Sequence, residues 1–317
     1  MIDKKVKQKN EYLAAKRLTQ IENIVFDVII YLTLLFIVVV TVYPFWNTIA
    51  ISFNDGLDAV KGGIKLWPRK FTWQNYKALF TTGQIYSAFG ISVTRTVLQT
   101  VISVFCTALL AYALSRKEFV LRRPLTTVLV ISMYVSAGLI PGYMLIKKLG
   151  LINKFAVYII PNIIDVFNFI LVRTYINGLP DSFVESARID GANEFKIFLK
   201  IILPLIVPSI AMICLFVAVG AWNSWFDTYL YTSSKTDLYS LQYVLMQFLN
   251  SSMNQSASAA DANAMAVAAS SGSLTAMVTP IALRSSITII ATVPILVVYP
   301  FVQKHFVVGM TIGGVKE

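Results

Sequence analysis

The sequence predicts an all-α polytopic membrane protein with six transmembrane helices, and three observations support this fold class. Charged residues make up only 14% of the 317 residues, against roughly 25% in soluble domains. The mean hydropathy is +0.68. Apolar runs long enough to cross a bilayer recur along the chain. A soluble fold could not bury this much apolar surface, so lipid is the expected solvent.

Each predicted span is an apolar run of about 20 residues or more, the length that a helix needs to cross a bilayer. The spans are predicted at about 24–50, 88–114, 126–146, 155–176, 203–223 and 281–302. Helices satisfy their own backbone hydrogen bonds in lipid, and the sequence lacks the alternation typical of transmembrane strands. The first run is too long for a signal-peptide core and is followed by no small-residue cleavage site.

Basic residues between the runs predict the orientation. Residues 1–23 carry Lys4, Lys5, Lys7, Lys9, Lys16 and Arg17. By the positive-inside rule we expect this N-terminal segment in the cytoplasm, followed by a transmembrane domain over 24–317 with its C-terminus on the same side. The net charge of +11 then reflects membrane topology, and nucleic-acid binding is not expected. Arg95 and Arg284 are expected to reach the membrane interface from the outer ends of their spans.

Two long segments are predicted to be external. Residues 51–85 are rich in Trp, Tyr and Lys, which is typical of an interfacial or ordered external segment. The second is an extracytoplasmic insert over 224–280, whose Ala- and Ser-rich part is compatible with a helix or with a mobile loop.

The residues that could carry chemistry are few. His305 is the single histidine, and Cys106 and Cys214 both lie inside apolar runs. The sequence contains no paired-cysteine metal pattern and no phosphate-binding GxxxxGK[ST] loop. We therefore predict no catalytic residue, no metal site and no cofactor in this chain, which we do not expect to be an enzyme.

The segment 180–204, between the fourth and fifth spans, predicts a helix, a bend and a second helix. Asp181 or Ser182 suits the N-cap of the first helix, and Gly191 permits a sharp change of direction. Pro204 marks the turn into the membrane. The apolar stripe predicted for the second helix is Phe195, Phe198, Leu199 and Ile202. By themselves these residues are compatible with an interfacial helix or with a docking surface.

The order of residues in this segment resembles the EAA loop of importer permeases of the ABC transporter superfamily. The matching residues are Glu185, Ser186, Ala187, Asp190, Gly191, Ala192, Ile201, Leu203 and Pro204. Ser186 stands where the pattern has alanine, so a small residue is retained. The resemblance implies that the first helix is a coupling helix seated in a cleft of an ATP-binding subunit. Glu185 would face a basic residue there, and Gly191 would allow the bend.

The resemblance also implies an assembly. It comprises this chain, a second permease, two ATP-binding subunits that bind ATP and Mg, and an extracytoplasmic solute-binding protein docked on the external segments. The text WPRKFTWQNYKALF, the fourth span and the ending YPFVQKHFVVGMTIGGVKE resemble the carbohydrate-importer branch. An oligosaccharide is the substrate that this implies. The C-terminal tail either enters the ATPase dimer or is disordered.

Polar residues inside the spans are candidates for the substrate path, because such groups are costly in a membrane. Asn162, Asp165 and Asn168 recur at every third position and so share a face of a helix. Amides and carboxylates bind sugar hydroxyls, and aromatic rings stack on sugars. The further candidates are Tyr134, Trp222 and Asn223. The alternative role of all six is hydrogen bonding between helices.

Two other functions stay open from the sequence. One is an ABC importer permease for amino acids or peptides, which the EAA loop alone does not distinguish. The other is an ion-coupled secondary transporter, which would predict inverted repeats and helices broken at the midplane. We find no internal repeat in the sequence.

Overall fold

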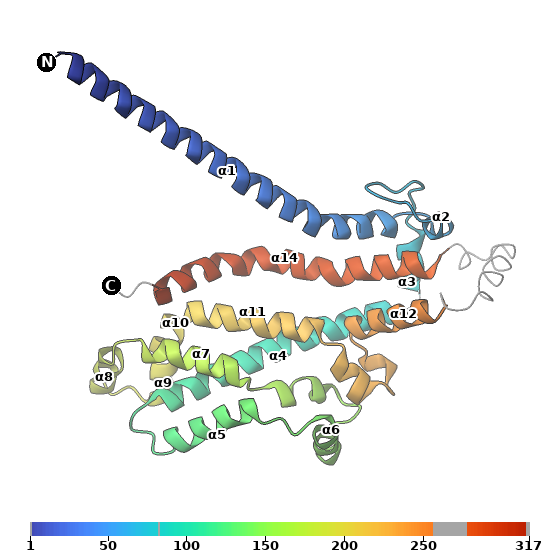
Figure 1. The fold of residues 1–317 in the computed structure, drawn as a ribbon. Helices are drawn as coiled ribbons and strands as arrows, with labels where there is room; N and C mark the ends of the chain where they lie inside the picture. Colours follow the sequence, from blue (N-terminus) through green and yellow to red (C-terminus); the bar gives the residue numbers. More distant parts are fainter. Residues whose placement is uncertain (1, 82, 256–277, 315–317) are drawn as a thin grey trace.

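The computed structural model describes the backbone of residues 2–81, 83–255 and 278–314, and the side chains of residues 24–81, 83–250 and 278–300. Within these ranges the regular structure is helical and no strand is present, apart from one isolated bridge between Asn54 and Phe71. The helices run roughly side by side in an elongated bundle, with α8 at one end and α2 and α3 at the other (Figure 1). The all-α prediction is confirmed.

The bounds of the helices follow the chain order. The α-helices are α1 (Ile2–Ser52), α2 (Gly56–Val60), α3 (Gln74–Thr81), α4 (Gln84–Ser115), α5 (Arg122–Tyr134), α6 (Leu139–Lys148), α7 (Val166–Asn177), α8 (Ser182–Ile189), α9 (Glu194–Ile197), α10 (Leu203–Leu205), α11 (Val207–Asn223), α12 (Leu241–Gln255) and α14 (Pro280–Gly314). Short 3-10 helices cover Phe155–Tyr158, Ile160–Asn162 and Thr236–Leu238, and π-helical turns cover Phe198–Ile202 and Thr228–Thr232.

Three of the predicted spans are continuous helices. Ile24–Ser52 within α1, the whole of α4, and Pro280–Pro300 within α14 are each long and apolar enough to cross a membrane. They coincide with the first, second and sixth predicted spans to within a few residues. Long apolar runs without internal breaks are therefore identified correctly from hydropathy.

The other three predicted spans are not continuous helices in the structure, so it does not confirm the count of six transmembrane helices. The fourth consists of the 3-10 segment 155–162 and α7, bent by 47°, and the fifth of 194–205 and α11, bent by 83°. Prolines 161, 204 and 208 stand beside these breaks, where a missing N–H weakens the helical ladder. The third is split into α5 and α6, of 13 and 10 residues, around the extended residues 135–138.

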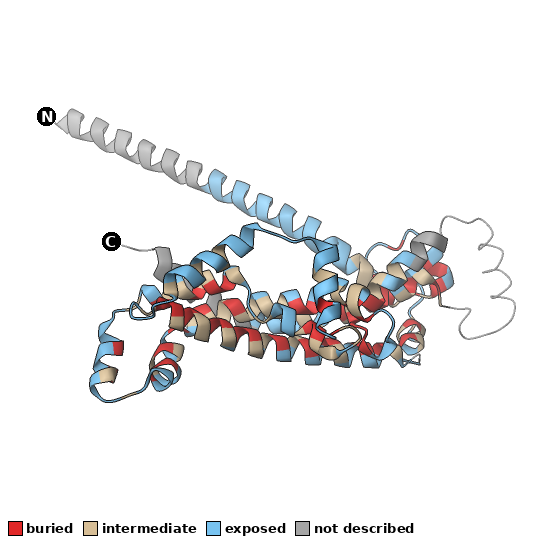
Figure 2. Cartoon of the chain, turned by 90° about the horizontal axis from the view of Figure 1, so that it is seen from below, coloured by how far each residue is buried: buried red, intermediate tan, exposed pale blue. Residues whose placement is uncertain are grey.

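The buried core surrounds α4. The C-terminal half of α4 packs against α7 and α11, through a cluster that includes Ala108, Phe169 and Ile213. Buried residues gather along these central helices, whereas α1 is exposed over most of its described length (Figure 2). Because α1 contacts the bundle mainly through α14, its apolar surface is left for lipid or for another subunit.

The segment 51–85 is folded, as its composition predicts. Asp58 pairs with Arg69 at 2.9 Å, and the buried Asn75 side chain donates to the backbone carbonyls of Ser52 and Asn54. Within the predicted insert 224–280, α12 packs against α4 and α14. The Ala- and Ser-rich part of that insert lies largely outside the described residues.

Candidate functional site

The helix–bend pattern predicted for 180–204 is confirmed. Helix α8 ends at Gly191, whose φ of +77° lies in the left-handed region. The Gly191 N–H donates to the carbonyl of Arg188, and the Ala192 N–H donates to that of Ala187, both at 3.0 Å. This pair of bonds is a Schellman motif, which terminates helices at glycine because no Cβ opposes the conformation.

Asp181 is the N-cap residue of α8, as predicted, but its side chain makes no capping hydrogen bond; it accepts from Lys117 Nζ at 2.9 Å instead. The predicted apolar stripe is wrong in part. In the second helical run, 194–205, Phe195 and Leu199 of the predicted stripe are exposed. The buried residues are Ile197, Phe198 and Ile202, because the π-helical turn at Phe198–Ile202 shifts the spacing from that of an α-helix.

Helix α8 keeps one face free. Val184 and Ala187 are buried against the bundle, while Glu185, Ser186 and Ile189 are exposed. Of the other residues of the EAA pattern, Asp190, Gly191 and Pro204 are exposed, and Ala192 and Leu203 are half-buried. Ile189 is 86% exposed, so the free face of α8 carries a large aliphatic side chain beside Glu185 and Ser186.

Ion pairs tie α8 to the loop that follows α4. Arg188 donates to Glu118 at 2.7 Å and to Glu194 at 2.8 Å, and Tyr112 of α4 donates to Glu194 at 2.6 Å. Lys117 and Asp181 form a second link at 2.9 Å. A displacement of α8 would therefore be transmitted to α4 through side-chain contacts as well as through the core.

These ion pairs lower the pKa values of the carboxylates that take part in them. The hydrogen bond from Arg188 lowers the pKa of Glu118 from 4.5 to about 2, and the hydrogen bond from Lys117 lowers the pKa of Asp181 below its ordinary value. A depressed carboxylate pKa means that the pairing is fully present above the unfolded-state value and is lost as the pH falls through the folded-state value.

We expect the link between α8 and the 116–121 loop to loosen as the pH falls from about 4.5 towards 2. Spin labels at the exposed positions Val120 and Ser186 should report an increase in distance or in mobility over that range. The Glu118→Gln variant, in which this position is neutral at every pH, should show a smaller change, with the Lys117–Asp181 pair still titrating. An identical titration in both proteins would contradict the assignment.

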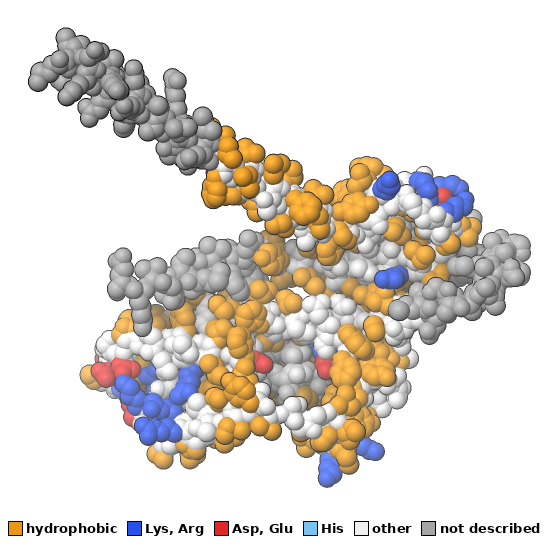
Figure 3. Space-filling view, viewed as in Figure 1, with side chains coloured by type: hydrophobic (Ala, Val, Ile, Leu, Met, Phe, Trp, Pro, Cys, Tyr) orange, Lys and Arg blue, Asp and Glu red, His pale blue; other side chains and the backbone are white. Residues whose placement is uncertain are grey.

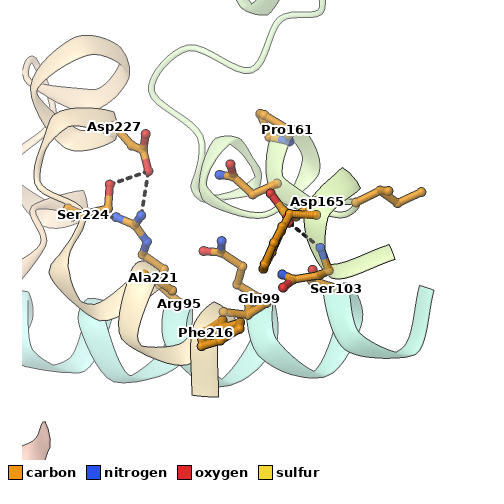
Figure 4. Close-up of a pocket in the computed structure, with 15 residues that line it drawn as sticks. Arg95, Gln99, Ser103, Pro161, Asp165, Phe216, Ala221, Ser224 and Asp227 are labelled. Atoms are coloured by element: carbon orange, nitrogen blue, oxygen red, sulfur yellow. Dashed lines mark hydrogen bonds and ion pairs between the residues drawn. The ribbon is translucent and has the colours of Figure 1, made fainter. Parts of the chain in front are cut away.

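A second site is a cavity of about 800 Å³ between α4, the start of α7 and the end of α11. Its polar lining residues are Arg95, Gln99, Ser103, Asn162, Asp165, Asn168, Ser224 and Asp227. The cavity opens on one face of the molecule, where acidic side chains lie on two sides of a hollow (Figure 3). In the close-up, Asp165 and Asp227 lie on opposite sides with Gln99 between them (Figure 4).

Three of the six predicted path residues line this cavity, namely Asn162, Asp165 and Asn168. The sequence predicted that these three residues share one face of a helix. They do not, because the helix is broken at this point. Asp165 is the N-cap of α7, and its Oδ1 accepts from the Asn168 N–H at 2.8 Å. All three residues nevertheless line the same cavity, although the helix is interrupted between them.

The other three predicted path residues do not line the cavity. Tyr134 is 82% exposed at the end of α5. The Trp222 indole N–H donates to the Ala291 carbonyl at 2.9 Å and so joins α11 to α14. Asn223 accepts a hydrogen bond from Gln242 at 3.3 Å. For Trp222 and Asn223 the packing alternative therefore describes the structure.

Sequence reasoning missed the contribution of α4. Arg95, Gln99 and Ser103 recur every four residues along this helix and point into the cavity (Figure 4). The signal was visible in the sequence as a polar stripe at helical spacing inside an apolar run. Asp227 carried no such signal, because it lies beyond the apolar run of α11, in a short helical turn directly before the π-helical turn Thr228–Thr232.

Arg95 does not reach the membrane interface, which corrects the expectation from the sequence. Its side chain is 1% exposed. It donates to Asp227 at 2.6 Å and to the Ser224 carbonyl at 3.1 Å, and it lies 4.6 Å from the centre of the Tyr158 ring. A buried cation needs such compensation, so this pair holds α4 against the segment after α11.

Known proteins resemble this chain over most of its length. The family model described as binding-protein-dependent transport system inner membrane component matches residues 108–312. The polygalacturonan/rhamnogalacturonan transport system permease protein YtcP of Bacillus subtilis is 37% identical, over 93% of this chain and 99% of that protein. The arabinooligosaccharides transport system permease protein AraQ of Halalkalibacterium halodurans is 29% identical, over 89% and 93% of the two chains.

A solved structure also matches. It belongs to a bacterial ABC transporter involved in the import of the acidic polysaccharide alginate, with a TM-score of 0.78 and 26% identity over 89% of this chain and 96% of that one. The broken spans, the capped α8 and the polar cavity therefore occur within an architecture that is shared with a known importer. The chain belongs to the family of binding-protein-dependent transport system inner membrane components, and is a permease subunit of an ABC transporter.

Proposed function

We propose that this chain is a permease subunit of an ATP-driven importer that carries an oligosaccharide across the cytoplasmic membrane, with α8 as the coupling helix. The observation that carries the proposal is the free face of α8, with Glu185, Ser186 and Ile189 exposed beside a rigid glycine bend. Such a face, anchored to the core by Val184 and Ala187, suits a helix that is pushed by another protein.

The carbohydrate assignment rests on the relatives and on the cavity together. The names of the relatives include polygalacturonan, arabinooligosaccharides and the alginate of the solved importer. Amide and carboxylate groups such as Asn162, Asp165 and Gln99 line the cavity, and these groups bind hydroxyls well. These names cover both acidic and neutral sugars, so they support carbohydrate as a class and leave its charge open.

The assembly proposed comprises this chain, a second permease, two ATP-binding subunits and an extracytoplasmic solute-binding protein. ATP and Mg would be bound by the ATP-binding subunits, and this chain would not itself be an enzyme. The broken segments 126–146, 155–176 and 203–223 would complete six membrane crossings, with both termini in the cytoplasm. The basic residues on the side of α8 support this orientation. The external segments, 51–85 and 224–280, would receive the binding protein.

The coupling role is tested by Ile189→Asp in the complete complex reconstituted in proteoliposomes. A charge placed in a docked apolar contact is expected to lower substrate-stimulated ATP hydrolysis and uptake at least tenfold, in keeping with interface hot spots. The matched control is Val120→Asp, an equally exposed aliphatic residue at the same end of the bundle, which should stay within twofold of wild type.

Co-purification of the ATP-binding subunits separates loss of assembly from loss of coupling. Full stimulation and full uptake with Ile189→Asp would contradict the assignment of α8 as the coupling helix. Uptake of amino acids or peptides, with no carbohydrate transported, would instead favour the alternative importer class.

A further inference from the structure

The polar atoms around the cavity are not all used by the protein. Gln99 Oε1, Ser103 Oγ, Asn168 Oδ1 and Arg95 Nε have no hydrogen-bond partner among the described residues, although all four residues are more than nine-tenths buried. A buried polar atom without a partner is costly. Because all four residues line the same cavity, these atoms indicate a ligand or water that exchanges hydrogen bonds with them.

The chemistry of these atoms favours hydroxyl groups. Two of the four are amide oxygens, which accept hydrogen bonds, and one is a hydroxyl, which both donates and accepts; the Arg95 Nε–H is a donor. Asn162 and the carboxylate of Asp165 add further acceptors on the side of α7. A ring that carries several hydroxyl groups presents donors to such a surface, whereas an ionised carboxylate presents only acceptors.

The charge of the cavity lining also favours a ligand that carries hydroxyl groups and no negative charge. The ionisable groups that line the cavity are one guanidinium, Arg95, and two carboxylates, Asp165 and Asp227. Arg95 is already paired with Asp227 at 2.6 Å and is 1% exposed. Asp165 is exposed, and the hydrogen bond that its side chain accepts from the described residues comes from the Asn168 backbone N–H. Within the described part of the chain the lining therefore carries one more negative than positive group, and its cation, Arg95, already pairs with a carboxylate.

We propose that this cavity binds a neutral, hydroxyl-bearing sugar unit and disfavours a uronate, and that Asp165 is the residue that discriminates between them. The inference rests on the proposed function, since it specifies the charge of the carbohydrate at the same site. Some of the relatives are named for acidic polysaccharides. The preference proposed for this chain differs from those names, because it depends on the side chains of this chain. Any carboxylate on a longer substrate would lie outside this cavity.

The test compares matched trisaccharides that differ only at C6, such as galactotriose and trigalacturonate, together with the corresponding glucose and mannose pairs. Binding of radiolabelled sugars to the purified complex is measured by equilibrium dialysis without the binding protein, whose own preference then does not enter. Wild type should bind the neutral member more tightly. The variant is Asp165→Asn, which keeps the helix cap because asparagine caps as well as aspartate does.

Asp165→Asn should reduce the preference for the neutral sugar about tenfold, the size expected for one charge acting at several ångströms in a partly polar site. The matched control is Asp27→Asn, which removes the same charge from an exposed position on α1 and should leave the preference unchanged. Gln99→Leu should weaken both sugars at least fivefold, because it removes a hydroxyl partner without changing charge.

The outcomes separate the two proposals. An unchanged preference in Asp165→Asn, tighter binding of the uronates by wild type, or no binding of any pair would overturn this inference. The proposed function has its own readout, ATP-driven uptake of carbohydrate by proteoliposomes with the binding protein present. If uptake persists while the preference is unaffected by Asp165→Asn, only the inference fails; if no carbohydrate is taken up, the proposed function fails.

Discussion

Replacing Gly191 by proline is expected to lower ATP-driven uptake to below a hundredth of the wild-type rate. Proline fixes φ near −65°, whereas Gly191 has a φ of +77°. Proline also removes the N–H that donates to the Arg188 carbonyl at 3.0 Å. The cost of such a misfit is about 3 kcal/mol or more, which reduces the population of the correctly turned α8 about a hundredfold.

A series of substitutions at Gly191 tests whether the loss of uptake comes from the backbone conformation. A Cβ at Gly191 would meet no atom within 4 Å, so the loss should follow conformation and not size. Gly191→Asn should be closest to wild type because asparagine tolerates the left-handed region, and Gly191→Ala should lose about 1 kcal/mol. Uptake, ATP hydrolysis and co-purification of the ATP-binding subunits are measured for each. Normal uptake by the proline variant would show that the bend is not needed for coupling.

Removing the carboxylate of Asp227 is expected to destabilise the protein by about 3–5 kcal/mol, the range for breaking a buried ion pair. Asp227→Ala leaves the Arg95 guanidinium in the core with the Ser224 carbonyl and the Tyr158 ring as its neighbours. Asp227→Asn keeps a hydrogen-bond acceptor and should lose less. The measurement is the fraction of the complex that stays monodisperse after heating, followed by size-exclusion chromatography.

The double variant Arg95→Met with Asp227→Ala is the informative control. It removes both charges, so most of the lost stability should return, as it does when buried ion pairs are replaced by apolar residues. Equal stability of Asp227→Ala and wild type would mean that Arg95 finds another anion, and Asp165 on the opposite side of the cavity is then the candidate. A further loss of stability in the double variant would indicate that the two side chains also position the helices, in addition to neutralising each other.

The sequence alone determined the features that depend on local pattern. The fold class followed from the low charge content and from apolar runs, and the three unbroken runs coincide with α1, α4 and α14. Helix α8 and its end at Gly191 were predictable because a left-handed residue after a short amphipathic helix requires glycine. Asn162, Asp165 and Asn168 were identifiable because polar groups are costly inside apolar segments.

Only the tertiary structure decided how these pieces meet. Hydropathy averages over a window, so it does not register the bends of 47° and 83°. The path candidates Tyr134, Trp222 and Asn223 do not line the cavity, because residue type alone does not reveal which way a side chain faces. The pairing of Arg95 with Asp227 joins residues 132 positions apart, and no local propensity specifies such a contact. The cavity exists because packing brings α4, the capped start of α7 and the end of α11 together. That arrangement determines the charge of the cavity and which of its polar atoms have no hydrogen-bond partner.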